Sequence, residues 1–146
     1  MYFEEFELGQ KFELPEITLT AQEIREFAEK YDPQPIHIDA LFAEQGLFKG
    51  IIASGFHTLS AIWGEWIRLN KFGTEIIGGT GMDFVSWSAP VRAGDRLFTE
   101  VEVAEKSLSQ SGRRGQVALK FTAKNQDGTV VLTTQGRAYL KSRMAE

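Results

Sequence analysis

The stretch Tyr31–Phe42 brings together residue types that can move protons. It contains Asp32 and His37, one of only two histidines in the chain, and two of the four prolines. Proline fixes its own φ and keeps the preceding residue out of the helical region, so Pro33 and Pro35 predict a stiff extended loop. A carboxylate and an imidazole held on such a loop can share one water and exchange protons with it. The alternative is that Asp32 caps a neighbouring element and His37 is a satisfied structural histidine.

The composition indicates one ordinary globular domain spanning residues 1–146, with 42% hydrophobic and 12% aromatic residues. The net charge of −4 gives no basic footprint for nucleic acid. The absence of cysteine excludes disulfides, thiolate nucleophiles and cysteine zinc sites, and it fits a reducing cytosol. No apolar run approaches the ~20 residues of a membrane helix, and the acidic N-terminus lacks a signal-peptide pattern. We therefore expect a cytoplasmic protein with no membrane or nucleic-acid partner.

Short elements are predicted to position the Asp32–His37 stretch. Residues 1–19 predict a turn and an edge strand. The capping-box pattern Thr20–Glu23 predicts a helix that ends near Tyr31, because the prolines cannot continue it. Asp39 is well placed to cap a short helix that runs to Gln45, and we favour this capping role over a catalytic one.

From Ile76 onward the apolar residues recur with a period of two, which predicts strands. The predicted strands are Ile76–Ala89, Asp95–Ala104, Gly115–Asn125 and Thr129–Lys141. A loop rich in Ser, Gly and Arg is expected at 105–114, and Asp127-Gly128 is a hairpin signal. Helices followed by a run of antiparallel strands predict an α+β fold.

The longest helix is predicted to open at Ser54-Gly55 and to close at Gly73. It is apolar on most of its circumference, which is typical of a helix wrapped by other structure. One curled sheet leaves a side of this helix open, and Trp63 and Trp66 are too apolar to remain there. We therefore expect a homodimer, or a dimer of dimers, that covers this surface.

Three segments resemble one family. Asp32-Pro33-Gln34-Pro35-Ile36-His37 is similar to the Asp-x-Asn/Gln-Pro-x-His signature of the MaoC-like dehydratases, or (R)-specific enoyl-CoA hydratases. Ile52-Ala53-Ser54-Gly55-Phe56 follows at that family's spacing, and Ala89-Pro90-Val91-Arg92-Ala93-Gly94-Asp95 resembles its Pro-Val-x-x-Gly-Asp turn. The resemblance extends from Phe3 to about Tyr139. It implies a hot-dog fold, in which a curled antiparallel sheet wraps a long helix, usually in a dimer.

The resemblance also implies a reaction and a set of site residues. Water would add reversibly to a trans-2-enoyl-CoA to give an (R)-3-hydroxyacyl-CoA, and no cofactor is expected because coenzyme A is part of the substrate. Asp32 and His37 would hold the water, and a backbone N–H at the helix that opens at Gly55 would stabilise the enolate oxygen. Glycine at this position would let the backbone approach the thioester closely. The matching motifs add Gln34, Ile36, Ser54 and Phe56 as substrate-binding residues.

Two departures from the family concern the substrate. Many hydratases carry His where this chain has Ser54, which we interpret mainly as a helix N-cap. Some members place a small hydroxyl residue where this chain has Trp63, and an indole there predicts a shorter acyl pocket. Arg113 and Arg114 are candidate ligands for the CoA phosphates, with a solvated hairpin tip as the alternative. His57 is interpreted as a packed helix residue.

Three other functions remain open from the sequence. A thioesterase on the same fold would use Asp32 to activate water against the carbonyl rather than the double bond. A metal site could draw on Asp32, His37, Asp39 and His57, although two histidines and no cysteine make it the weaker hypothesis. A non-catalytic acyl-CoA-binding module would bind the thioester without turnover.

Overall fold

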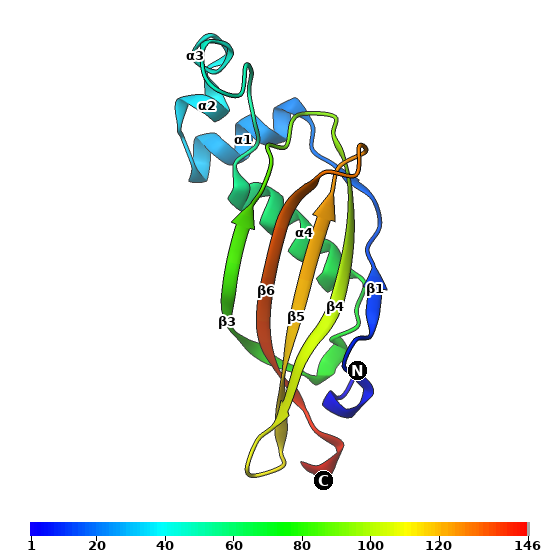
Figure 1. The fold of residues 1–146 in the computed structure, drawn as a ribbon. Helices are drawn as coiled ribbons and strands as arrows, with labels where there is room; N and C mark the ends of the chain where they lie inside the picture. The colour runs from blue at the N-terminus through cyan, green and yellow to red at the C-terminus, as the bar shows by residue number, and fades with distance from the viewer. Residues whose placement is uncertain (146) are drawn as a thin grey trace.

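The strands of the second half form one antiparallel sheet, and the long helix lies across one of its faces (Figure 1). The computed structural model describes residues 1–145. The α-helices are α1 (Ala21–Tyr31), α2 (Pro35–Ile38), α3 (Ala40–Gln45) and α4 (Gly55–Arg68). The strands are β1 (Lys11–Glu13), β2 (Ile17–Thr18), β3 (Ile76–Trp87), β4 (Arg96–Leu108), β5 (Arg114–Lys124) and β6 (Val130–Lys141). Short 3-10 helices occur at η1 (Phe3–Glu5), η2 (Gly73–Glu75) and η3 (Arg143–Ala145). The expected α+β hot-dog fold is confirmed.

The sheet has the strand order β1-β4-β5-β6-β3, and β2 pairs separately with β4. Each neighbouring pair is antiparallel. Within residues 1–145, the outer side of β3 pairs with no other strand, so β3 is an open edge. The β3–β6 register shifts at three places between Ile76 and Phe84, in a segment that contains Gly78, Gly79 and Gly81. β3 ends beside the start of α4, at the end of the molecule that carries α1 to α3 (Figure 1).

The core lies between α4 and the sheet. Trp66 is fully buried and makes edge-to-face contacts with Phe12, Phe72 and Phe121. Its burial corrects the expectation that Trp66 lies on the open side of the helix, because the helical turn directs it into the core. Trp63 remains 36% exposed, although its ring also contacts Phe121. None of the helices described within residues 1–145 is long and apolar enough to cross a lipid bilayer.

Side-chain caps begin two of the helices as predicted. The Glu23 N–H donates to the Thr20 hydroxyl oxygen at 3.1 Å, and the Thr20 N–H donates to the Glu23 carboxylate at 3.0 Å. The Phe42 N–H donates to the Asp39 carboxylate at 3.1 Å, which begins α3. Both predicted caps are confirmed, and the capping carboxylate of Asp39 is thereby committed to a structural role.

Two local predictions are wrong. The segment after Asp32 is not extended throughout, because Pro35 occupies the first position of the one-turn helix α2. Proline is tolerated there, since the N–H that it lacks has no partner within a helix anyway. Half of the predicted loop 105–114 is strand, because β4 continues to Leu108, which pairs with Gly115, and β5 begins at Arg114. The ring of Phe3 occupies the space that a Cβ at Gly115 would need.

Candidate active site

Asp32 and His37 are brought into contact by the helices on either side of the loop. Asp32 ends α1, where its N–H donates to the Ala28 carbonyl, and His37 lies in the single turn of α2. The distance from His37 Nε2 to Asp32 Oδ2 is 3.3 Å. The side chains are 4% and 15% exposed, respectively. The two groups singled out in the sequence therefore form a nearly buried carboxylate–imidazole pair.

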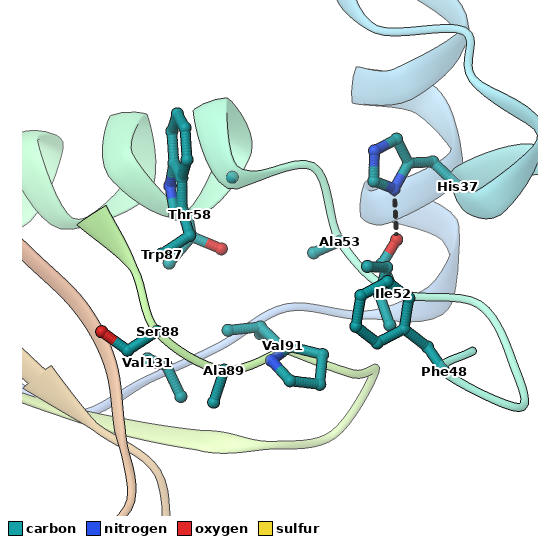
Figure 2. Close-up of a pocket in the computed structure, with 12 residues that line it drawn as sticks. His37, Phe48, Ile52, Ala53, Thr58, Trp87, Ser88, Ala89, Val91 and Val131 are labelled. Carbon is teal, nitrogen blue, oxygen red and sulfur yellow. Dashed lines mark hydrogen bonds between the residues drawn. The ribbon is translucent and has the colours of Figure 1, made fainter. Parts of the chain in front are cut away.

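A backbone carbonyl fixes the orientation of the His37 ring. His37 Nδ1 lies 2.7 Å from the carbonyl oxygen of Ile52 (Figure 2). Because a carbonyl oxygen can only accept, Nδ1 carries a hydrogen in this contact. Nε2 is then the ring nitrogen that gains or loses a proton, and it is the one that faces Asp32.

The Asp32 carboxylate is held by two further side chains. The Ser54 hydroxyl donates to Oδ2 at 2.7 Å, and the Gln34 amide donates to Oδ1 at 2.7 Å. Burial alone would raise the pKa of the Asp32 carboxyl, but these hydrogen bonds and the adjacent His37 keep the pKa below its ordinary value. Asp32 is therefore ionised at neutral pH.

The positions of Ser54 and Gln34 change two expectations. The Ser54 side chain makes no capping hydrogen bond at the start of α4, because its hydroxyl is directed to Asp32 instead. The Ser54 carbonyl still accepts the N–H groups of His57 and Thr58 in the first turn. Gln34 was expected to bind substrate, and the structure shows its amide bound to the Asp32 carboxylate. Both residues position the acid.

A mostly apolar cavity of about 240 Å³ opens beside His37. We call it the His37 cavity. It lies between the start of α4, the segment before it and the end of β3 (Figure 2). Its other walls comprise Phe48, Ile52, Ala53, Gly55, Thr58, residues 87–91 and Val131. Figure 2 shows His37 and Trp87 on opposite sides of this space. The cavity thus runs from the imidazole to the N-terminus of α4.

Gly55 is the first residue of α4 and lines the His37 cavity. The Ser54 carbonyl takes the N–H groups of His57 and Thr58, so the N–H groups of Gly55 and Phe56 are the ones left without a partner within the helix. The helix dipole there favours negative charge. A Cβ at this position would overlap the indole of Trp87. The indole of Trp87 therefore requires glycine at position 55. This reason comes in addition to the close approach of a thioester to the backbone, which the sequence suggested.

Three other predicted residues lie outside the His37 cavity. The Ile36 carbonyl accepts the Ile52 N–H at 3.2 Å, so Ile36 holds the two segments of the site together. Phe56 is exposed and contacts the Trp87 ring edge-on, with 5.3 Å between centroids. Trp63 lines a separate cavity further along α4. The expectation that Trp63 ends the pocket beside His37 is therefore not met within one chain.

Arg113 and Arg114 lie far from the candidate site. Arg113 lies in the turn between β4 and β5, and Arg114 is the first residue of β5. This turn forms the end of the sheet opposite α1 to α3 (Figure 1). The Arg114 guanidinium lies over the Tyr139 ring at 4.3 Å. The chain therefore does not bring these arginines to the thioester site of the same protomer, because the strands between them run the length of the sheet.

Sequence reasoning missed Trp87, Thr58 and Val131, which line the His37 cavity. Trp87 stands two residues before the recognised turn that begins at Ala89. The alternation of apolar residues in a strand shows which side chains share a face, but it does not show which helix that face meets. The antiparallel course of β3, which returns to the start of α4, supplies that information (Figure 1).

His57 is packed as expected. Its ring stacks on Phe27 with 4.6 Å between centroids, and its Nδ1 has no hydrogen-bond partner among residues 1–145. Burial lowers the pKa of His57, and the charge of Glu23 partly opposes this. Among residues 1–145, no three His, Cys, Asp or Glu side chains come together as they would around a metal ion.

Comparisons with known proteins identify a family and support the fold. The family described as the MaoC like domain matches residues 4–125. The uncharacterized protein YdeM of Bacillus subtilis (strain 168) is 41% identical over 106 residues, which are 73% of this chain and 75% of that protein. A 3-hydroxybutyryl-CoA dehydratase of Methylorubrum extorquens is 35% identical over 122 residues, which are 81% of this chain and 72% of that protein. The solved MaoC-like dehydratase of Rhodospirillum rubrum aligns with a TM-score of 0.86 and 32% identity over 98% of each chain.

Proposed function

Because the chain belongs to the MaoC-like dehydratase family, we propose that it reversibly adds water to a trans-2-enoyl-CoA to give an (R)-3-hydroxyacyl-CoA. The observation that carries this proposal is the Asp32–His37 pair beside an apolar cavity that reaches a helix N-terminus. The hydration of an enoyl thioester needs three features: a proton-transfer pair, an apolar space for the acyl group and a hydrogen-bond donor for the enolate oxygen. Coenzyme A belongs to the substrate, and the reaction needs no further cofactor.

The two members of the pair take complementary roles in this proposal. Ionised Asp32 accepts a proton from the water as its oxygen bonds to C3 of the enoyl group. Protonated His37 donates its Nε2 hydrogen to C2, so the water contributes OH and the pair contributes H. The proton taken by Asp32 then returns to His37 across the 3.3 Å contact or through solvent. Dehydration follows the same steps in reverse.

The enolate oxygen is assigned to the first turn of α4. Negative charge develops on the thioester oxygen while C3 is attacked, before C2 is protonated. The free N–H groups around Gly55 and the positive end of the helix dipole stabilise that charge. Removing one such donor commonly costs several kcal/mol of transition-state stabilisation, so this contact is a large part of the proposed catalysis.

Turnover on enoyl-CoA thioesters tests the proposal. Loss of the enoyl absorbance measures hydration, whereas release of free CoA measures the alternative thioesterase reaction. Asp32→Asn and His37→Ala are each expected to lower kcat by at least ~10²-fold. Asp39→Asn is the matched control, because asparagine also caps a helix and Asp39 begins α3. Near-wild-type hydration by either pair variant would remove the catalytic assignment, and CoA release without loss of the enoyl group would favour the thioesterase.

We further propose that two copies associate along β3 and α4. β3 is an open edge strand, and large apolar side chains are exposed on these two elements. These side chains are Phe56, Trp63 and Ile67 on α4 and Ile77, Met82, Phe84 and Trp87 on β3. A second copy placed on this surface would bury them symmetrically. The mass in solution, measured by light scattering, tests this assembly.

A further inference from the structure

Two cavities lie between α4 and β3, and only one of them reaches His37. The second, which we call the lower cavity, has a volume of about 370 Å³ and is almost entirely apolar. It shares no lining residue with the His37 cavity. Its principal walls are Leu59, Ser60 and Trp63 of α4 and Gly79, Gly81 and Met82 of β3. α4 and β3 therefore both line two apolar cavities, which lie at different positions along α4.

Trp87 lines the His37 cavity on the side opposite His37 (Figure 2). Its indole lies against Gly55 and lines the His37 cavity. It also contacts Phe56 at an interplanar angle of 64°. Phe56, Ser60 and Trp63 are spaced by one helical turn and therefore share one face of α4. Ser60 and Trp63 line the lower cavity, so Phe56 and the indole that it contacts lie one helical turn before that cavity.

We propose that Trp87 determines acyl-chain length by restricting the His37 cavity to short or compact acyl groups. This inference rests on the proposed hydratase function. The His37 cavity, at about 240 Å³, is smaller than the ~300–1,000 Å³ of pockets that enclose drug-sized ligands. A short acyl group fits between His37 and the indole. A longer chain would have to displace the ring to reach the lower cavity.

The lower cavity suits the tail of a long acyl chain once the ring is removed. Gly79 and Gly81 contribute no side chain, and a Cβ built at Gly81 would meet no atom within 4 Å. The remaining walls are largely aliphatic or aromatic, which favours the burial of methylene groups. Trp87 is 45% exposed in the single chain, so its truncation removes little of the protomer core. Because Trp87 also belongs to the proposed dimer surface, the mass of Trp87→Ala in solution is measured beside its kinetics, and only a variant with the wild-type mass is compared.

The experiment compares kcat/KM for crotonyl-CoA and octenoyl-CoA in wild type, Trp87→Ala and Trp87→Phe. The octenoyl-to-crotonyl ratio is expected to rise at least ~10-fold in Trp87→Ala, since a few methylenes gain an apolar site. Trp87→Phe keeps an aromatic wall and is expected to retain the short-chain preference. Phe98→Ala is the matched control, because Phe98 is similarly exposed but lies on β4, three strands from β3.

Several outcomes would overturn the inference. An equal change for both substrates in Trp87→Ala would make the indole a general structural residue. A shift in the ratio produced by Trp63→Ala alone would transfer the role to Trp63. If Trp87→Ala does not fold, as judged by circular dichroism, Trp87→Leu replaces it and the same criterion applies.

A binding measurement separates this inference from the proposed function. Absence of hydration of both thioesters by wild type would refute the hydratase reaction itself. Calorimetric titration with butyryl-CoA and octanoyl-CoA, which cannot be hydrated, then tests directly whether the Trp87 indole limits the length of the bound acyl chain. Preferential gain of octanoyl-CoA affinity in Trp87→Ala would support the inference, and unchanged relative affinities would overturn it.

Discussion

At the scale of single residues, Asp32 and His37 are held by different kinds of partner. Side-chain donors from Ser54 and Gln34 stabilise the negative charge on Asp32. The backbone carbonyl of Ile52 fixes the hydrogen on His37 Nδ1 and leaves Nε2 free to exchange. This asymmetry favours Asp32 as the group that accepts the water proton. Ser54 acts through Asp32 and is therefore a positioning residue.

Ser54→Ala removes the hydrogen bond to the Asp32 carboxylate. The pKa of Asp32 is expected to rise toward its ordinary value. A lowered carboxyl pKa adds stability that is present above the unfolded value, ~3.9, and is lost as the pH falls through the folded value. The free energy of unfolding near pH 7 should therefore fall by about 1–2 kcal/mol, and less in acid. Urea unfolding at neutral and acidic pH measures this difference.

Ser60→Ala is the control for this prediction, because it makes the same change on an exposed side chain of the same helix. It is expected to alter the unfolding free energy by less than ~0.5 kcal/mol. Equal losses in the two variants would show that the Ser54 hydroxyl adds nothing through Asp32.

His57→Gln is expected to weaken the pH dependence of stability. Burial lowers the pKa of His57, and the nearby Glu23 carboxylate opposes this only in part. Below the unfolded pKa of ~6.5, the unfolded chain therefore binds more protons than the folded one. Stability is full above that pH and declines as the pH falls toward the folded value. Melting temperatures from about pH 7 to pH 5 measure the slope, and an unchanged slope in His57→Gln would contradict the assignment.

The residue types of the pair were predictable, but their partners were not. The spacing of Asp32 and His37 on a proline-bounded loop predicts that they lie close together, and the structure brings them within 3.3 Å. Ser54 follows Asp32 by 22 residues in sequence, and only the return of the chain at the start of α4 brings its hydroxyl to Asp32. Local sequence pattern carries no information about such a contact.

At the scale of elements, the start of α4 and the end of β3 meet where Gly55 lies against Trp87. The sequence predicts that a helix opens at Gly55, because Ser54-Gly55 precedes a run with helical period. The contact with Trp87 depends on where β3 ends relative to α4, which is a property of the sheet topology. The same distinction explains the error at Pro35, where a proline at a helix start and a proline in an extended loop look alike in sequence.

Gly55→Ala is expected to destabilise the protein through Trp87. The added methyl group would overlap the indole, and inserting a methyl into a packed site typically costs ~1–3 kcal/mol. The cost should be smaller when Trp87→Ala has already removed the ring. Urea unfolding of the two single variants and the double variant gives the coupling free energy. Equal costs of Gly55→Ala in both backgrounds would show that the indole is not the obstacle.

At the scale of the whole molecule, the two ends of the sheet are distinct. The Asp32–His37 pair lies at the end that carries α1 to α3, and Arg113 and Arg114 lie at the other (Figure 1). The sequence predicted the layers, because a change of period from helical to two marks the passage from helix to sheet. It did not predict this separation, which depends on the length and direction of β4 and β5.

The exposed apolar surface on α4 and β3 leads to a prediction about assembly. Wild type is expected to be a dimer, and Phe84→Asp is expected to be largely monomeric. A carboxylate at this position would be buried without a partner in the proposed interface, which is strongly unfavourable. Phe98→Asp is a close control, because Phe98 is 41% exposed and Phe84 is 42% exposed, but Phe98 lies on β4. Light scattering over a range of protein concentrations gives the masses. A monomeric wild type, or equal dissociation of both variants, would show that β3 and α4 do not form the interface.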